Sequence, residues 1–409
     1  MNPVAWIIVI TLAGEYLLGI LADVLNIRTL SQPLPGEFQG LFDSRAYAKS
    51  QEYTKARAVF GIWSATWNIA LVFGFWFAGG FDWLDALVRG WGMGTILSGL
   101  AYIGILLFCR GILALPWSAY STFVIEERFG FNKTTVGTYV ADLLKGIGLA
   151  VALGGPLLFV VLWLFGHAGA WAWLYCWGAM VLFTLTVQFV APAWIMPLFN
   201  KFTPLEEGEL RNRIVSFAES VKFSLQNVFV IDGSKRSAKS NAFFTGFGKN
   251  KRIALFDTLI RQHTIDELVA VLAHEIGHYK KRHILQGIII AILHSGIMLY
   301  LFSLLLDRKE LYDAFFMSRQ SLYAGLIYCG LLVSPFEFVL SLFLHALSRK
   351  NEFSADRFAA ETTGHPAIMV DALKKLSLNN LSHLTPHRLY VILNYSHPPV
   401  LERIRALNG

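Results

Sequence analysis

The chain has 409 residues, of which 55% are hydrophobic and 15% are charged. Soluble domains carry about 25% charged residues, so this composition excludes a disordered chain and disfavours a purely soluble enzyme. In so apolar a chain, the formal net charge of +7 is typical of the cytoplasmic loops of a membrane protein. The three cysteines form no CxxC pair, which argues against a disulfide framework and a cysteine zinc site.

Seven apolar segments are long enough to cross a bilayer, because a helix needs about 20 mostly apolar residues to do so. The first has no basic region before it and no cleavage site of the kind that ends a signal peptide, so it counts as a span. The sequence therefore predicts an all-α, polytopic membrane protein. Its spans cover residues 5–25, 58–80, 91–113, two crossings within 146–200 that turn at His167, 284–306 and 321–347.

The distribution of lysine and arginine between the connecting loops predicts the orientation. Residues 27–57 contain five of these side chains, whereas residues 81–90 contain only Arg89 beside two aspartates. The N-terminus is therefore expected outside and the C-terminus on the cytoplasmic side, as an odd number of spans requires. The basic residues follow this topology instead of forming one patch, so no nucleic-acid partner is expected.

Two soluble-looking pieces, residues 201–283 and 348–409, fall on the predicted cytoplasmic side. Neither piece is large enough to build a comfortable core alone, so we expect them to fold together as one split domain. The predicted organisation is a transmembrane region of five spans over residues 1–200, the first part of the split domain, two spans over residues 284–347, and the second part.

Residues 274–278 contain the pattern HExxH in a stretch without helix breakers, after a capping box that begins at Thr264. Residues four apart share one helix face, so His274 and His278 can bind one zinc ion. Glu275 then projects beside the metal, where a general base for hydrolysis belongs. The pattern predicts a catalytic zinc site.

Two histidines leave a third protein ligand to be found. Glu352 and Asp356 lie one helical turn apart on the same face. Glu352 is therefore a candidate ligand, and Asp356 is a candidate acceptor for the free N–H of a zinc-bound histidine. Ligand chemistry alone leaves Glu361 open as the competing carboxylate.

Further motifs occur in a fixed order along nearly the whole chain. They are EERFGFNK at 126–133, PLFNKFTPL at 197–205, SNAFFTG at 240–246, KNKRIALFDTL at 249–259, HEIGH at 274–278, EFSAD at 352–356 and YSHPP at 395–399, followed by Arg403. In this ordered set the chain resembles the integral-membrane CAAX prenyl protease type I family, which are zinc endopeptidases of the gluzincin kind. HExxH alone occurs in many protease families, whereas the ordered set is far more specific.

The resemblance implies seven long helices around a water-filled chamber, with a split gluzincin-like protease domain. It implies one Zn²⁺ per chain, held by His274, His278 and Glu352 at the cytoplasmic side of the chamber. It also implies a zinc metalloendopeptidase in which Glu275 activates the attacking water. In eukaryotic members, cleavage falls near the C-terminus of prenylated CAAX substrates.

Two more polar residues are expected near the metal. The family pattern puts His397 there, which makes it a candidate donor to the oxyanion that forms during hydrolysis. Its residue type alone favours a loop or capping role. Arg403 is expected to orient His397 or to pair with Asp356, with an ordinary surface arginine as the alternative.

Residues 240–246 and 252–256 predict a β-hairpin. An exposed edge there would bind the substrate as an added strand, through Asn241, Ala242 and Phe243. Turn chemistry explains Asn241 equally well.

The expected partners are a peptide or protein substrate, prenylated or not, and membrane lipid, and a monomer is the expected oligomeric state. The C-terminus has no dilysine-type retrieval tail, which favours a bacterial inner membrane over the ER membrane. Quality control of membrane proteins without prenyl specificity is then the alternative function. A transporter and a silent zinc scaffold are weaker alternatives, because no inverted repeat is visible and Glu275 is intact.

Overall fold

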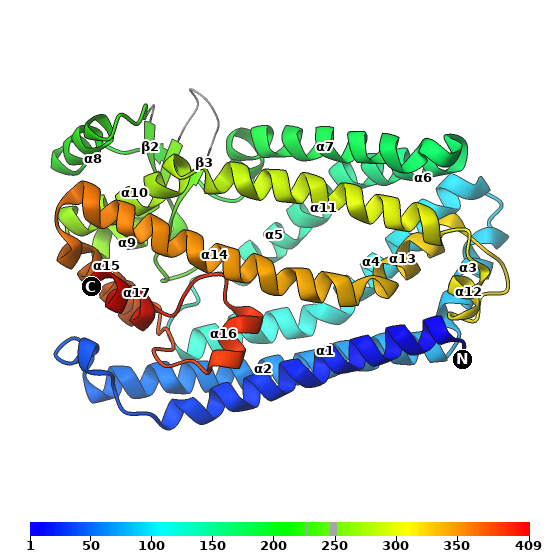
Figure 1. The fold of residues 1–409 in the computed structure, drawn as a ribbon, viewed down its shortest axis with the longest axis horizontal. Helices are drawn as coiled ribbons and strands as arrows, with labels where there is room; N and C mark the ends of the chain where they lie inside the picture. Colours follow the sequence, from blue (N-terminus) through cyan, green and yellow to red (C-terminus); the bar gives the residue numbers. More distant parts are fainter. Residues whose placement is uncertain (226, 246–251) are drawn as a thin grey trace.

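A computed structural model describes residues 1–225, 227–245 and 252–409. Long helices run along the long axis of the molecule, and a smaller part with a β-sheet forms one end (Figure 1). The N-terminus lies at the opposite end of this axis from the C-terminus. An odd number of membrane crossings agrees with this arrangement.

Within the described residues, six helical stretches are long and apolar enough to cross a bilayer. They contain α1 (Pro3–Arg28), α2 (Ser44–Phe77), α4 (Gly94–Tyr120), α5 (Val136–Leu149) continued as α6 (Gly155–His167), α7 (Ala172–Val190) and α11 (His283–Leu305). A seventh candidate is the bent pair α13 (Leu322–Leu332) and α14 (Ser334–Thr363). The predicted all-α polytopic fold is confirmed, and the predicted turn at His167 separates α6 from α7.

The seventh span is not straight. α13 and α14 meet at Val333 with a bend of 51°, where the sequence predicts one uninterrupted segment over residues 321–347. Pro335 lies in the first turn of α14. A proline has no N–H to donate to the preceding turn, and its ring clashes with the backbone of that turn, so a continuous helix is interrupted there. α14 then runs on to Thr363, so one helix joins the membrane region to the second soluble piece.

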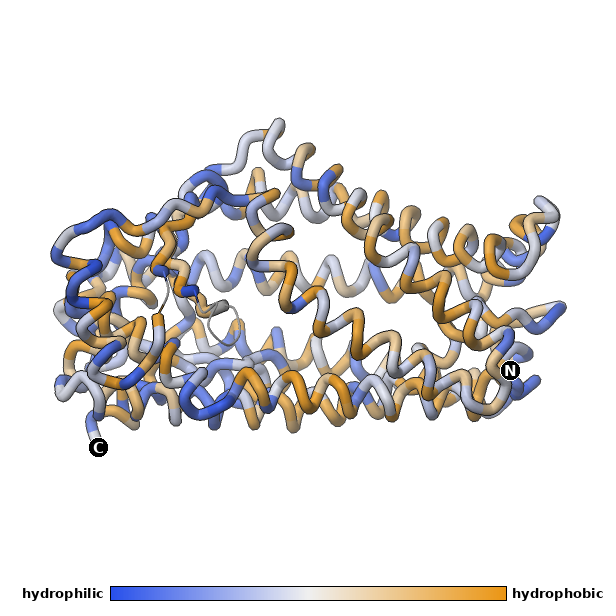
Figure 2. Tube along the Cα trace, turned by 90° about the horizontal axis from the view of Figure 1, so that it is seen from above, coloured by the Kyte–Doolittle hydropathy of each residue, from blue (hydrophilic) through white to orange (hydrophobic). Residues whose placement is uncertain are grey.

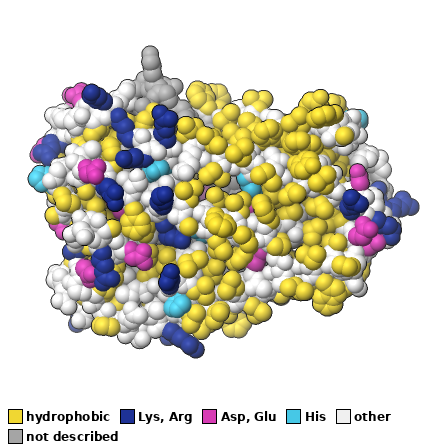
Figure 3. All heavy atoms as spheres, viewed as in Figure 1, with side chains coloured by type: hydrophobic (Ala, Val, Ile, Leu, Met, Phe, Trp, Pro, Cys, Tyr) yellow, Lys and Arg dark blue, Asp and Glu magenta, His cyan; other side chains and the backbone are white. Residues whose placement is uncertain are grey.

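The long helices present large apolar side chains outward. Leu182 and Phe343 are 69% and 70% exposed, which would be unfavourable in water. Hydrophobic residues form a broad band over the long helices (Figure 2 and Figure 3). Lysine and arginine gather at the end that carries the C-terminus (Figure 3). This band is the surface that faces lipid.

The end with the N-terminus is closed by the short helices α3 (Gly80–Gly90) and α12 (Lys309–Asp313). Trp76 stacks on Phe315 with ring centroids 4.5 Å apart, and its indole N–H donates to the carbonyl oxygen of Ala314 at 2.9 Å. Buried residues of α1, α3, α4 and α13 belong to the same core. This core joins the helix ends on the side remote from the sheet.

The sheet consists of β1 (Phe202–Pro204), β2 (Asn227–Ile231), β3 (Ala242–Thr245) and β4 (Arg252–Phe256), in the order β1-β2-β4-β3. β3 and β4 pair antiparallel, which confirms the predicted hairpin, and its turn at 246–251 lies outside the described residues. Among the described strands, β3 forms one edge of the sheet. An edge strand carries unpaired N–H and C=O groups that can bind a further strand.

The helices around the sheet share one core. Ile253 and Leu272 come from the first soluble piece and Ala359 and Leu373 from the second, and none is more than 4% exposed. The common core is a physical reason for the two pieces to fold as one unit. These helices are α8 (Glu209–Ser220), α9 (Asp257–Gln262), α10 (Ile265–Lys280), α15 (Pro366–Asn379) and α17 (Val400–Leu407), together with the end of α14. A further short helix, α16 (Arg388–Asn394), packs against α1 and α14.

Candidate active site and metal centre

Helix α10 carries the HExxH side chains. Both halves of the predicted capping box are present: the Glu267 N–H donates to Thr264 Oγ1 at 3.3 Å, and the Thr264 N–H donates to the Glu267 carboxylate at 2.9 Å. The side chains of Leu268 and Leu272 are buried in the shared core. The capping box fixes where the helix begins, and the buried leucines fix which face meets the core. The polar residues of the motif therefore lie on the remaining face.

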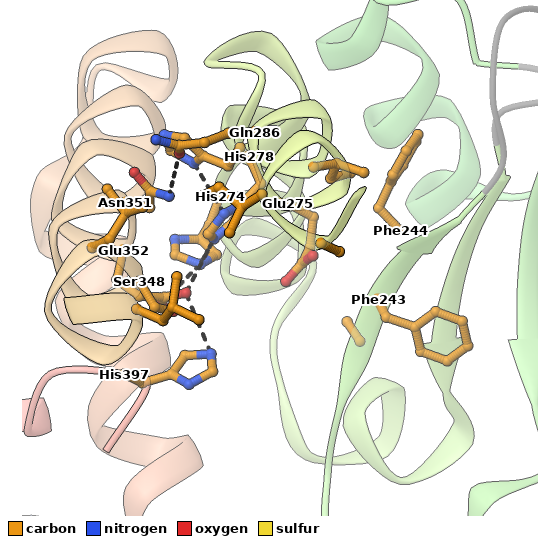
Figure 4. A pocket seen from close by; sticks show the side chains of 18 of the residues that line it. Phe243, Phe244, His274, Glu275, His278, Gln286, Ser348, Asn351, Glu352 and His397 are labelled. Atoms are coloured by element: carbon orange, nitrogen blue, oxygen red, sulfur yellow. Dashed lines mark hydrogen bonds and ion pairs between the residues drawn. The ribbon is translucent and has the colours of Figure 1, made fainter. Parts of the chain in front are cut away.

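α14 packs against α10 at a distance that a glycine permits. A Cβ on Gly277 would lie 3.2 Å from both the Cα and the carbonyl oxygen of Ala355. Backbone atoms cannot rotate away, so the close approach depends on the missing side chain. The contact brings Glu352 of α14 beside the histidines of α10 (Figure 4), and Asp356 lies beside His274.

His274, His278 and Glu352 form a cluster that fits a metal ion. The two Nε2 atoms are 3.1 Å apart, and the Glu352 oxygens lie 3.3 Å from Nε2 of His278 and 3.5 Å from Nε2 of His274. Ligand atoms at about 2.0–2.1 Å from a tetrahedral zinc ion are about 3.3 Å from one another, so the spacing suits zinc. Oε2 of Glu352 is buried and accepts no hydrogen bond from the described residues, which leaves it for a metal.

Asp356 and Arg403 support the first of these histidines. Oδ1 of Asp356 is 2.9 Å from Nδ1 of His274, so the ring nitrogen remote from the metal position donates to a carboxylate. Arg403 donates to both oxygens of Asp356, at 2.6 and 2.7 Å. Of the two roles open to Arg403, the structure contains the pairing with Asp356.

The charge of this group has a consequence for metal binding. Burial lowers the pKa of His274, but the neighbouring carboxylates of Asp356 and Glu352 outweigh burial and raise the pKa to about 9. Without a metal, the ring therefore holds a second proton at neutral pH. A metal ion must displace that proton, so its affinity falls as the pH falls.

His283 is a neighbour of the site that sequence patterns do not reveal. Its Nδ1 is 3.1 Å from Nδ1 of His278. Arg282 adopts a left-handed conformation with φ 61°, and this turn between α10 and α11 brings the two rings together. Helical spacing carries no signal for the pair, because residues five apart do not share a helix face.

Glu275 faces a cavity of about 660 Å³. Its side chain lies between the metal-ligand candidates and β3 (Figure 4). Burial raises the pKa of the Glu275 carboxyl, which makes it a stronger base near neutral pH. The position and the pKa both suit a general base.

His397 reaches the site from the segment between α16 and α17. Its side chain is 65% exposed, and its Nε2 lies 3.3 Å from Oε1 of Glu352. Oγ of Ser396 lies 2.9 Å from the other ring nitrogen, Nδ1. A polar nitrogen is thus present beside the metal position, as a donor to an oxyanion requires.

The edge strand β3 borders the same cavity. Asn241, Ala242 and Phe243, the three residues expected to bind substrate, all line it, together with Phe244. The backbone N–H of Ala242 donates to Oδ1 of Asn241 at 2.9 Å. Asn241 therefore contacts the backbone of its own neighbour and faces the cavity at the start of the edge strand.

Two family models cover nearly the whole chain. One, described as CAAX prenyl protease N-terminal, five membrane helices, matches residues 23–201, and the model of peptidase family M48 matches residues 204–409. The chain belongs to peptidase family M48. M48 membership confirms the predicted resemblance and the predicted enzyme class.

Individual M48 relatives match over the same length. A CAAX prenyl protease 1 homolog of Arabidopsis thaliana is 36% identical over 403 residues, which cover 96% of this chain and 95% of the relative. The Saccharomyces cerevisiae CAAX prenyl protease 1 is 37% identical, covering 92% and 88%, and a Homo sapiens homolog is 35% identical, covering 91% and 88%. The crystal structure of S. mikatae Ste24p has a TM-score of 0.94 at 34% identity, with 100% of both chains covered.

As an M48 protein, the chain is a multi-pass membrane metalloprotease that acts on peptide or protein substrates. Membership of M48 implies zinc, and the cluster of His274, His278 and Glu352 offers a site for it. The competing carboxylate Glu361 is exposed to solvent.

Proposed function

We propose that this M48 protease cleaves peptide bonds near the C-terminus of prenylated CAAX-type substrates. The supporting observation is that Glu275 and the metal-ligand candidates open onto a cavity with an apolar wall between two membrane helices. Relatives that match over most of their length bear the name CAAX prenyl protease 1.

The apolar wall suits an isoprenoid chain. Ile284 and Ile290 of α11 and Leu344 and Leu347 of α14 line the cavity. Transfer of a prenyl chain to such surroundings is favourable by about 0.8 kcal/mol for each buried CH₂ group. The prenyl group of a bound substrate then lies between the membrane helices, and the peptide bond that follows the prenylated cysteine lies beside Glu275.

In this proposal, His274, His278 and Glu352 hold one zinc ion, and Asp356 with Arg403 fixes the orientation of His274. Zinc, when bound, supplies a Lewis acid that polarises the scissile carbonyl and lowers the pKa of water in the site. The remaining steps belong to side chains and backbone groups of this chain.

Glu275 accepts the proton of the attacking water and later delivers it to the leaving amine. His397 donates a hydrogen bond to the carbonyl oxygen as negative charge develops on it. Asn241, Ala242 and Phe243 bind the substrate backbone as a strand added to β3.

We further propose that the site faces the cytoplasm, because lysine and arginine gather at the end that carries it (Figure 3). The bacterial inner membrane stays the predicted host membrane, with the ER membrane as its alternative, and a monomer stays the predicted state. The four-part organisation 1–200, 201–283, 284–347 and 348–409 also stays a proposal.

The test is paired and uses the full-length protein in detergent. Zinc content and cleavage of a farnesylated CAAX peptide are measured for the wild type and for Glu275→Gln. We expect one zinc per chain in both proteins and a kcat about 10²–10⁴-fold lower in the variant, because the general base is lost. Glu361→Gln, on an exposed carboxylate of α14, is the matched control and should change neither quantity.

The outcomes separate the competing functions. Equal cleavage of the farnesylated peptide and its unprenylated counterpart would favour quality control without prenyl specificity. A folded protein that binds no zinc would contradict the proposed metal centre, and full activity of Glu275→Gln would contradict the proposed base.

A further inference from the structure

A second cavity, of about 850 Å³, adjoins the active site. It borders the first at Asn241 and His397, which line both. Its walls come from α1, α2, the end of α15 and the chain that follows. Most of the lining residues are polar, and they include Asn26, Thr54, Asn380, Asn394 and Tyr395.

Arg57 of α2 faces this cavity without an ion-pair partner among the described residues. Within the described residues its side chain makes one hydrogen bond, from Nη1 to Oη of Tyr53 at 3.5 Å. Among those residues, no carboxylate oxygen lies within 4.0 Å of a guanidinium nitrogen of Arg57, the limit for an ion pair. Asp23 also lines the cavity but forms no such pair with Arg57.

Tyr53 holds Arg57 in place without neutralising it. The guanidinium carbon lies 5.6 Å from the centre of the Tyr53 ring, and Tyr53 is buried, with 3% of the residue exposed. Tyr53 donates to Glu126 at 2.5 Å and accepts from Lys239 at 2.6 Å, and Lys239 pairs with Glu126 at 2.8 Å. The charge of Glu126 is therefore matched by Lys239, and Arg57 is left as a positioned cation that faces water.

The direction of β3 orients a bound substrate. Ser240 lines only the polar cavity, Asn241 lines both, and Phe244 lines only the apolar one. An antiparallel added strand, which is the more stable pairing, runs in the opposite direction to β3. Its N-terminal part therefore follows the apolar cavity, and its C-terminal part enters the polar cavity.

We propose that Arg57 binds the C-terminal carboxylate of the substrate in the polar cavity. The inference rests on the proposed function, in which the substrate ends three residues beyond the cleaved bond. Three extended residues span about 10 Å. Arg57 offers a carboxylate two parallel N–H groups, since Tyr53 contacts only Nη1. Arg57 is thus a specificity residue that selects cleavage close to a free C-terminus.

The test compares one farnesylated peptide with a free C-terminal carboxylate and the same peptide with a C-terminal amide. We expect the wild type to prefer the acid by about 10–100-fold in kcat/KM, as is typical of a charge-assisted hydrogen-bonded pair. Arg57→Gln should lower kcat/KM for the acid by the same factor, mainly through KM, and leave the amide unchanged. Arg57→Lys should restore part of the preference.

Lys55→Gln is the matched control, because it removes one positive charge from an exposed position of α2 that does not line the cavity. It should keep the wild-type preference, and all variants should keep the wild-type zinc content. The assignment would be overturned if Arg57→Gln slowed the cleavage of both peptides equally, or if the wild type cleaved both equally well. Either result would leave the proposed function intact. A wild type that cleaves neither peptide would overturn the proposed function and this inference with it.

Discussion

The Asp356 carboxylate connects Arg403 to His274. It accepts from Nδ1 of the histidine and from two nitrogens of the guanidinium, and it is 3% exposed. When the second proton leaves the ring, the proton held on Nδ1 ensures that the free lone pair is the one on Nε2, which is directed at the other metal-ligand candidates. Asp356 therefore sets the tautomer and the orientation of the ring, and it lines neither of the two cavities.

Asp356→Asn should weaken zinc binding. An asparagine oxygen still accepts from His274, but the amide no longer balances the charge of Arg403, which is 12% exposed. We expect zinc affinity about 10–100-fold lower than in the wild type, measured by competition with a chelator. Asp371→Asn, on an exposed site of α15, controls for the substitution itself. An unchanged affinity in Asp356→Asn would show that the carboxylate has no role in holding the metal.

At the scale of elements, the site depends on how closely α10 and α14 pack. Gly277 stands where the two helices touch, and a Cβ there would also lie 3.1 Å from a ring carbon of Phe358. The metal-ligand candidates come from both helices, so a small separation changes all their mutual distances. Zinc tolerates little change, because its ligands lie at about 2.0–2.2 Å.

The substitution Gly277→Ala therefore has two effects that act on stability in opposite directions. Alanine favours the helical state by up to about 1 kcal/mol over glycine. The new methyl group meets the backbone of Ala355, so the helices must move apart. We expect the second effect to prevail, with a lower midpoint of thermal unfolding and weaker zinc binding.

The control for this prediction is Gly104→Ala in α4, where a Cβ meets no atom within 4 Å. Its thermal midpoint should equal or exceed that of the wild type. A higher midpoint with unchanged zinc affinity in Gly277→Ala would show that the close approach is not needed.

At the scale of the whole molecule, the first helix is joined to the last part of the chain. The backbone N–H of His387 donates to Oδ1 of Asn26 at 3.0 Å, and Nε2 of His383 lies 3.4 Å from Oγ1 of Thr29. Nδ1 of His383 is buried and has no hydrogen-bond partner among the described residues. A protonated ring would place a second donor there without an acceptor.

This arrangement predicts loss of stability in mild acid. Burial lowers the pKa of His383 to about 4 from its ordinary 6.5. Between pH 4 and pH 6.5 the unfolded chain binds more protons at this histidine than the folded chain does. The free energy of unfolding therefore has its full value above pH 6.5 and falls as the pH drops toward 4. At pH 5 the free energy of unfolding is lower than at neutral pH by on the order of 2 kcal/mol because of this one group.

His383→Asn removes the titrating ring. We expect the fall in thermal midpoint between pH 7.5 and pH 5 to be smaller in this variant than in the wild type, since the other histidines titrate alike in both. His365→Asn, at an exposed position, should retain the wild-type pH dependence. Equal pH dependence in His383→Asn and the wild type would contradict the assignment.

Local patterns predicted much of this protein. Runs of apolar residues marked the spans, because helix length and bilayer thickness are matched over a single stretch of chain. The capping box at Thr264 and the i, i+4 spacing of His274 and His278 are likewise local, and the structure contains both arrangements. The β-hairpin was predictable for the same reason.

What the sequence by itself determined is therefore the set of elements, the membrane class and the residue types of a zinc protease. Ligand chemistry left Glu352 and Glu361 both open, and the family resemblance favoured Glu352. The structure places Glu352 beside the histidines and leaves Glu361, about two and a half turns further along α14, exposed. It also brought His283 to His278 through a left-handed turn and set Arg57 at a cavity shared with residues far along the chain. Contacts of this kind depend on the packing of distant elements, which no spacing within one segment encodes.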